Sequence, residues 1–78
     1  MAISREEFEN KCMDVIEQIV ASDRTLDRQG AILVAERLVE RAKATGKKLT
    51  IDLYTRVLNE FKIATDKEYE KLKKQIFD

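Results

Sequence analysis

The scarcity of residues that end helices constrains this chain more than any other feature of its sequence. Its 78 residues contain no proline and only two glycines, Gly30 and Gly46. Proline and glycine are the residues that most strongly mark turns and interrupt helices. Long stretches without them therefore predict helices joined by a few short connections. A chain of this length is expected to form one helical domain over residues 1–78.

Capping residues mark several of the expected helix ends. Ser4 and Glu7 form a Ser-x-x-Glu capping box, and Thr65 and Glu68 form a Thr-x-x-Glu box. Gly46 follows a helical pattern at the position where a left-handed residue commonly ends a helix. A phosphate-binding loop would need an earlier glycine and a preceding strand, so the helix end is the better interpretation of Gly46.

The second and third helices have less distinct beginnings. Asp23 or Thr25 is the expected N-cap of the second helix. Thr50, with Leu49 and Tyr54 on either side, is the expected N-cap of the third. Together with apolar residues at three- and four-residue spacing, these signals predict an all-α fold. It is a compact bundle of four short helices at about 4–21, 25–44, 51–63 and 66–77.

The apolar faces of these helices differ in width. The second helix has the broadest face and is therefore the expected centre of the bundle, with neighbours roughly antiparallel because the connections are short. The fourth helix has a narrow apolar line and is expected to be the least stable. It is predicted to pack on its own chain, to extend from the third helix or to dock on a second copy.

Charge is segregated along the chain although the net charge is zero. Residues 1–23 hold six acidic and two basic residues, a net of −4, and residues 24–48 hold three acidic and seven basic residues, a net of +4. The remaining residues are balanced. This distribution indicates that the first two helices lie side by side, or that it steers two copies into contact.

Few residues are suited to catalysis or metal binding. The chain has no histidine and a single cysteine, Cys12, so the usual zinc patterns and an intramolecular disulfide are not expected. Cys12 lies on the apolar face of the first helix, which predicts a buried structural thiol. The carboxylates fall on polar helix faces among basic residues, which is typical of a solvated surface. We therefore predict no catalytic residues, no metal site, no cofactor and no small-molecule substrate, and no enzymatic activity.

No apolar run approaches the roughly 20 residues that cross a bilayer, and the first ten residues lack the apolar stretch of a signal peptide. With one unpaired cysteine, this composition favours a reducing compartment. We expect a cytoplasmic protein without a membrane partner.

Small residues on the second helix form the first candidate binding surface. Gly30, Ala31 and Ala35 share one side of this helix, where they allow another backbone to come close. This strip is interpreted as an internal crossing with the first or third helix, or as a contact surface for a partner or second copy. A third alternative is that the helix begins after Gly30 and leaves residues 24–29 as a charged loop.

A basic cluster at the end of the second helix is the other candidate surface: Arg41, Lys43, Lys47 and Lys48. These cations suit a protein partner, and they also suit nucleic-acid phosphates. The segment 51–77 resembles a helix-turn-helix in outline, but acidic residues are interleaved with its lysines, and the isoelectric point is near 6.3. Nucleic-acid binding is therefore the alternative hypothesis.

The sequence as a whole favours a small non-enzymatic helical protein that acts through protein–protein binding, as a regulator, adaptor or inhibitor. Its partner is another protein or a second copy of itself. A dimer is expected because a chain of this size buries a modest core, worth roughly 3–5 kcal/mol net.

Overall fold

Four helices make up the part of the chain that the computed structural model describes, residues 3–78. They are α1 (Arg5–Ala21), α2 (Arg28–Thr45), α3 (Lys48–Ile63) and α4 (Asp66–Phe77). No strand occurs within residues 3–78. The predicted all-α fold of four short helices is confirmed.

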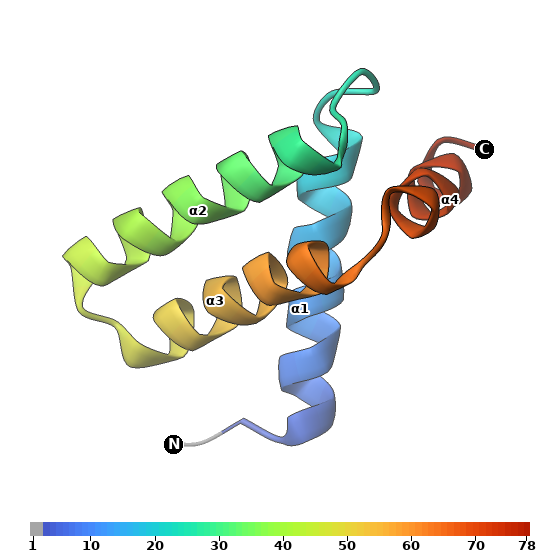
Figure 1. Ribbon diagram of the computed structural model, residues 1–78. Coiled ribbons are helices and arrows are strands. Elements are labelled where there is room, and N and C mark those ends of the chain that lie inside the picture. Colours follow the sequence, from blue (N-terminus) through green and yellow to red (C-terminus); the bar gives the residue numbers. More distant parts are fainter. Residues whose placement is uncertain (1–2) are drawn as a thin grey trace.

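The helices are arranged as one antiparallel pair that is crossed by a third helix (Figure 1). α2 and α3 lie side by side, and α1 runs across them at a steep angle. α4 lies beyond the end of α3 and packs against α1 and α2. The expectation of antiparallel neighbours holds for α2 and α3. It is wrong for α1 and α2, because the connection at residues 22–27 lets the chain turn across the pair instead of reversing.

Side chains from all four helices form the core. α2 contacts each of the other helices, as expected of a central helix, but its buried positions are mostly alanine. The larger buried side chains come from α1, α3 and α4, where Phe61 and Tyr69 meet edge to face with their ring centroids 6.0 Å apart. The buried cluster comprises Cys12, Ile16, Ile19, Val20, Ala31, Ala35, Val57, Phe61 and Tyr69. Small residues on α2 thus make room for bulky ones on its neighbours.

Tyr69 attaches α4 to the rest of the chain. Its side chain is only 1% exposed, and its hydroxyl donates a hydrogen bond of 2.9 Å to the carbonyl oxygen of Leu26. The Lys73 ammonium donates to the same carbonyl at 3.3 Å. Leu26 lies in the connection between α1 and α2, so α4 packs on its own chain at that connection.

Two arginines add to this attachment. The Arg28 guanidinium donates from Nε to Asp66 Oδ1 at 2.6 Å and from Nη1 to the Phe61 carbonyl at 3.2 Å. It therefore joins the start of α2 to the end of α3 and the first turn of α4. The Arg24 guanidinium lies 4.9 Å from the centre of the Phe77 ring, near the end of α4. α4 is thus held to its own chain by apolar packing and by polar contacts that are spread along its length.

Two predicted helix starts are wrong. α2 begins at Arg28 because Asp27 is the N-cap and accepts a hydrogen bond from the Gly30 N–H at 2.8 Å. Asp23 accepts instead from the backbone and hydroxyl of Thr25, which closes a turn before the helix. This local bonding competes with helix formation and is common for aspartate and threonine.

α3 begins three residues earlier than predicted, at Lys48. Its N-cap is Lys47, so Thr50 lies inside the first turn and does not cap the helix. The predicted cap at Gly46 is confirmed: its φ is 71°, and its N–H donates to the Ala42 carbonyl at 3.2 Å. The Thr65 and Glu68 capping box is also confirmed with both of its hydrogen bonds, and the Glu7 N–H donates to Ser4 Oγ at 3.1 Å.

The reason for a glycine at position 30 lies in the preceding connection. A Cβ atom at Gly30 would lie 2.6 Å from Leu26 Cδ1 and 3.2 Å from Asp27 Oδ1. The residue therefore makes space for the Leu26 side chain and the Asp27 cap. The alternative that α2 begins after Gly30 is wrong, because α2 begins at Arg28. The internal crossing holds for Ala31 and Ala35, which are buried where α2 meets its neighbours, whereas Gly30 faces the preceding connection.

Charges on α1 and α2 do not pair as the sequence indicated. Within residues 3–78, no ion pair joins α1 to α2. The acidic helix α1 reaches α3 instead, where Glu9 Oε1 lies 4.0 Å from Arg56 Nη2. The steep crossing of α1 explains the difference, because it leaves most of the α1 surface away from α2.

Replacing Gly46 with alanine tests the left-handed cap. We expect the free energy of unfolding to fall by about 1 kcal/mol, because a side chain disfavours positive φ. No atom lies within 4 Å of the position that the new Cβ would occupy, so the loss is conformational. Urea denaturation measures it. Gly46→Asn is the matched control and should lose less, since asparagine tolerates this conformation.

Replacing Tyr69 with phenylalanine tests the attachment of α4. At pH 7 we expect a loss of about 1 kcal/mol in the free energy of unfolding, as for a typical hydrogen bond. Burial raises the pKa of the Tyr69 hydroxyl. Its neutral form therefore stabilises the native protein below about pH 10, and this contribution is lost as the pH rises further. The difference in the free energy of unfolding between the two proteins should become smaller at alkaline pH. A difference that does not change with pH would contradict the stabilising role of the neutral Tyr69 hydroxyl.

Candidate partner-binding groove

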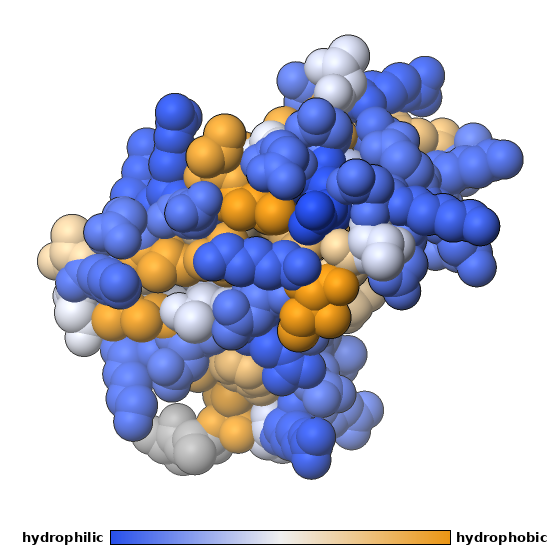
Figure 2. Space-filling model, in the orientation of Figure 1, coloured by the Kyte–Doolittle hydropathy of each residue, from blue (hydrophilic) through white to orange (hydrophobic). Residues whose placement is uncertain are grey.

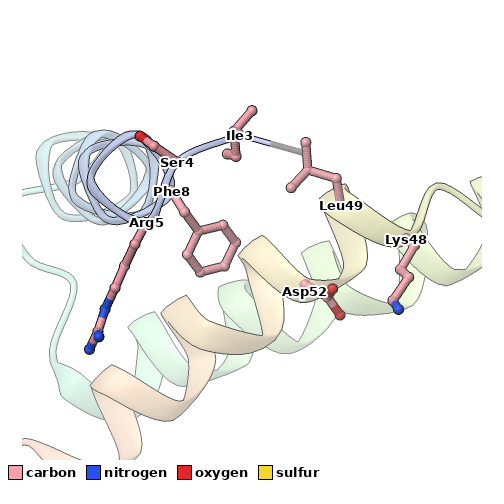
Figure 3. Close-up of a pocket in the computed structure, with 7 residues that line it drawn as sticks. All are labelled: Ile3, Ser4, Arg5, Phe8, Lys48, Leu49 and Asp52. Carbon is pink, nitrogen blue, oxygen red and sulfur yellow. The ribbon is translucent and has the colours of Figure 1, made fainter. Parts of the chain in front are cut away.

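A concave surface lies between the start of α1 and the start of α3. We call it the amino-terminal groove; it has a volume of about 500 Å³ and is lined by Ile3, Ser4, Arg5, Phe8, Lys48, Leu49 and Asp52. Figure 3 shows that the Phe8 ring points from α1 towards α3, and that Ile3 and Leu49 face each other across the opening. The groove is therefore built by the crossing of two helices far apart in sequence.

Its apolar lining is accessible to a partner. Leu49 is 46% exposed, and Ile3 and Phe8 are half-buried. On the face drawn in Figure 2, hydrophobic side chains run along the junction of α2 and α3 and are bordered by hydrophilic ones. An exposed leucine beside an aromatic side chain in a concave surface is more informative than isolated apolar residues, because it offers a connected area to a ligand.

The start of α3 gives the groove a polar feature. Lys47 has the extended backbone of an N-cap residue but makes no side-chain capping bond, whereas Ser4, Asp27 and Thr65 cap the other three helices. A helix N-terminus carries partial positive charge and free N–H donors, which lysines at this end reinforce. A carboxylate or hydroxyl from a ligand would supply the missing acceptor.

The seven residues singled out from the sequence do not form one surface. Ala31 and Ala35 are 0% and 1% exposed. Both are therefore buried in this chain's own core and are not accessible to a partner. Gly30 is half-buried at the start of α2. Lys47 and Lys48 lie at the start of α3, where Lys48 lines the amino-terminal groove.

The other two predicted residues, Arg41 and Lys43, are exposed on α2. The Lys43 ammonium lies 3.7 Å from Glu40 Oε1, so part of its charge is balanced locally. Arg41 borders a shallow surface with Glu36, Arg37 and Glu40. The two acids among the three bases on this part of α2 leave only a weak positive field.

Sequence reasoning missed the apolar half of the groove. In the sequence, Ile3 and Phe8 flank the expected cap at Ser4, and Leu49 precedes the one at Thr50, which is typical of residues that fix helix ends. The crossing of α1 over α3 cannot be deduced from either segment alone. The available signal was the pair Lys47 and Lys48 directly before an apolar residue, which is unusual at the positive end of a helix.

Cys12 is buried, as predicted. Burial raises the pKa of its thiol above the ordinary range, and the nearby Arg56 guanidinium opposes this only in part. A neutral, buried thiol fits a structural role. Within residues 3–78 no group of three potential ligands lies close enough to hold a metal ion. None of the helices in the same range combines the length and apolar character needed to cross a bilayer.

Replacing Lys47 with aspartate tests whether the start of α3 lacks a cap. We expect the free energy of unfolding to rise by about 1 kcal/mol, because the carboxylate can accept from first-turn N–H groups and interacts favourably with the helix dipole. Lys47→Ala is the control and should give a smaller gain, since it removes the charge without adding an acceptor. Equal gains in the two variants, measured by urea denaturation, would contradict a missing acceptor.

Comparisons of the chain with protein-family models, curated proteins and solved structures find no match. The function proposed for it therefore depends on its own grooves, charges and helix ends.

Proposed function

We propose that this protein is a small non-enzymatic binding protein whose amino-terminal groove receives an apolar segment of another protein carrying a carboxylate. One observation carries the proposal: Leu49 is 46% exposed beside a helix start that has no side-chain cap. Both features reduce the stability of the free protein. A partner would cover the exposed leucine and supply an acceptor for the N–H groups at the helix start. Binding sites commonly retain residues that are less stabilising than others would be at the same position.

The charges around the groove support an acidic rather than a basic ligand. Arg5 and Lys48 line it with one acid, Asp52, and Lys47 stands beside it. Glu6 and Glu7 belong to the first turn of α1 but do not line the groove. An apolar side chain would lie between Phe8 and Leu49 while the carboxylate approaches the start of α3.

A second copy is a less suitable occupant of this groove. Two-fold pairing places the same surface opposite itself, so Lys47 and Lys48 of one copy would face those of the other. Like charges held opposite each other oppose association. The predicted dimer is therefore not proposed at the amino-terminal groove.

Nucleic acid is also a less suitable partner. In a helix-turn-helix, the first residues of the second helix contact the bases. Here Asp66 and Glu68 occupy the first turn of α4 and would repel phosphates. Lys73 is bound to the Leu26 carbonyl and to Glu70, which lies 3.2 Å from its ammonium.

Peptide binding tests the proposal. The probe is a fluorescein-labelled helical peptide with leucines on one face and glutamates beside them, followed by fluorescence anisotropy. We expect Leu49→Ala and Lys48→Glu each to weaken binding by about tenfold or more, equivalent to about 1.4 kcal/mol. Lys48→Glu places an acid at a helix start, so it should not destabilise the fold.

Matched controls separate this site from general attraction to a charge. Lys71→Glu makes the same charge change on an exposed residue outside the groove and should alter the affinity by less than about twofold. A peptide with glutamine in place of glutamate should bind less tightly. Equal loss in both lysine variants would contradict the site, and preferential binding of a labelled oligonucleotide that weakens steeply with salt would favour the nucleic-acid alternative.

A further inference from the structure

A second concave surface lies further along α1, where this helix meets α3 and α4. It consists of two hollows of about 250 and 220 Å³ that share Met13, Ile16 and Glu60 as lining residues. Because the hollows have common walls, they adjoin, and we call them together the acidic groove. None of its lining residues belongs to the amino-terminal groove.

The floor of the acidic groove is apolar and belongs to the core. Cys12 and Ile16 contribute from α1, Phe61 from α3 and Tyr69 from α4. Met13 stands on the α1 side and is 47% exposed. An exposed methionine suits a binding surface, because its flexible and polarisable side chain adapts to different apolar partners.

The rim is predominantly acidic. Glu9, Glu60 and Glu68 line the two hollows together with a single base, Arg56. Arg56 Nε donates to Glu60 at 2.9 Å, and its Nη2 lies 4.0 Å from Glu9. One guanidinium therefore faces two carboxylates, while Glu68, which accepts from the Thr65 N–H, lies at the other end of the groove. Arg5, which lies outside the hollows, also approaches Glu9 at 3.6 Å. Three carboxylates against these two guanidiniums leave a net negative rim around an apolar floor.

We infer that the acidic groove binds an amphipathic helix of a partner protein that carries two apolar anchors and basic flanking residues. Two adjoining hollows match side chains three or four positions apart on one helix face. Lysine or arginine beside the anchors would meet the glutamates at the rim. This site is separate from the amino-terminal groove and takes a ligand of opposite charge, so the inference goes beyond the proposed function.

A second copy of the chain fits this groove poorly. Two-fold pairing would bring the glutamates of one copy against those of the other. Within residues 3–78, the large hydrophobic side chains that are exposed are Met13, Leu33, Leu49 and Ile63. The lysine-rich helix α4 has none of these, and Leu33 on α2 is flanked by both Glu36 and Arg37. Leu49 stands beside Lys47 and Lys48, but it reaches this groove only in a head-to-tail pairing, which must close into a ring or extend into a filament. We therefore assign the groove to another protein and treat self-association as the contrary outcome of the test.

Fluorescence anisotropy with a labelled synthetic helix tests the inference. The probe carries two leucines four residues apart and lysines at neighbouring positions, and a matched peptide has serine in place of both leucines. We expect the leucine peptide to bind at least about tenfold more tightly than the serine peptide, and Met13→Ala and Glu9→Lys each to weaken it about tenfold. The three full-length proteins are compared at equal helix content by circular dichroism.

Two further variants make the result specific. Asp14→Lys repeats the charge change of Glu9→Lys on an exposed α1 residue that lines neither hollow, and it should leave the affinity within about twofold. Lys48→Glu should not weaken the basic peptide, which separates this site from the amino-terminal groove. Equal binding of the serine peptide, or equal losses for Glu9→Lys and Asp14→Lys, would overturn the inference. So would self-association in sedimentation that Met13→Ala abolishes.

Discussion

The packing of Tyr69 determines whether α4 belongs to this fold. Its ring meets Phe61 in the core, and its hydroxyl reaches the Leu26 carbonyl in the connection between α1 and α2. One side chain thereby joins the last helix to the third and to the connection that aims α1 across the bundle. One of the two hollows of the acidic groove depends on this placement, since α4 supplies part of its wall. The stability of the last helix and the shape of the second binding surface consequently depend on the same residue.

The start of α3 shows a conflict between stability and surface chemistry. Two lysines stand where the helix dipole disfavours them, and Leu49 follows with almost half of its surface exposed. A threonine is available two residues after Lys48 but lies within the helix and does not cap it. The nearby end of α2 favours these cations, but local bonding gives no reason for the exposed Leu49, for which the groove offers the proposed role. That contrast is what distinguishes this helix start from the three capped ones.

Much of the fold follows from local signals. Gly46, Thr65 and Glu68 mark helix ends through interactions within a few residues, and the sequence contains all of that information. The predicted caps Asp23 and Thr25 are wrong because these two residues form hydrogen bonds with each other. Asp27 caps α2 instead. The grooves lay beyond sequence reasoning for a different reason. Each needs residues from helices that cross at an angle, and neither helix alone specifies that angle.

The charge segregation in the sequence is not accompanied by ion pairs between α1 and α2 within the described residues. The acidic α1 does not neutralise the basic α2, because it crosses the helical pair instead of lying along one member. Some of its carboxylates remain at the rim of the acidic groove, while lysines of the α2–α3 turn remain beside the amino-terminal groove. A chain with zero net charge thus presents two apolar surfaces with opposite electrostatic surroundings. Because like rims repel, each surface disfavours the same surface of a second copy and favours a ligand of the other sign. The two surfaces are neighbours along α1, because Arg5 beside one groove lies 3.6 Å from Glu9 at the rim of the other.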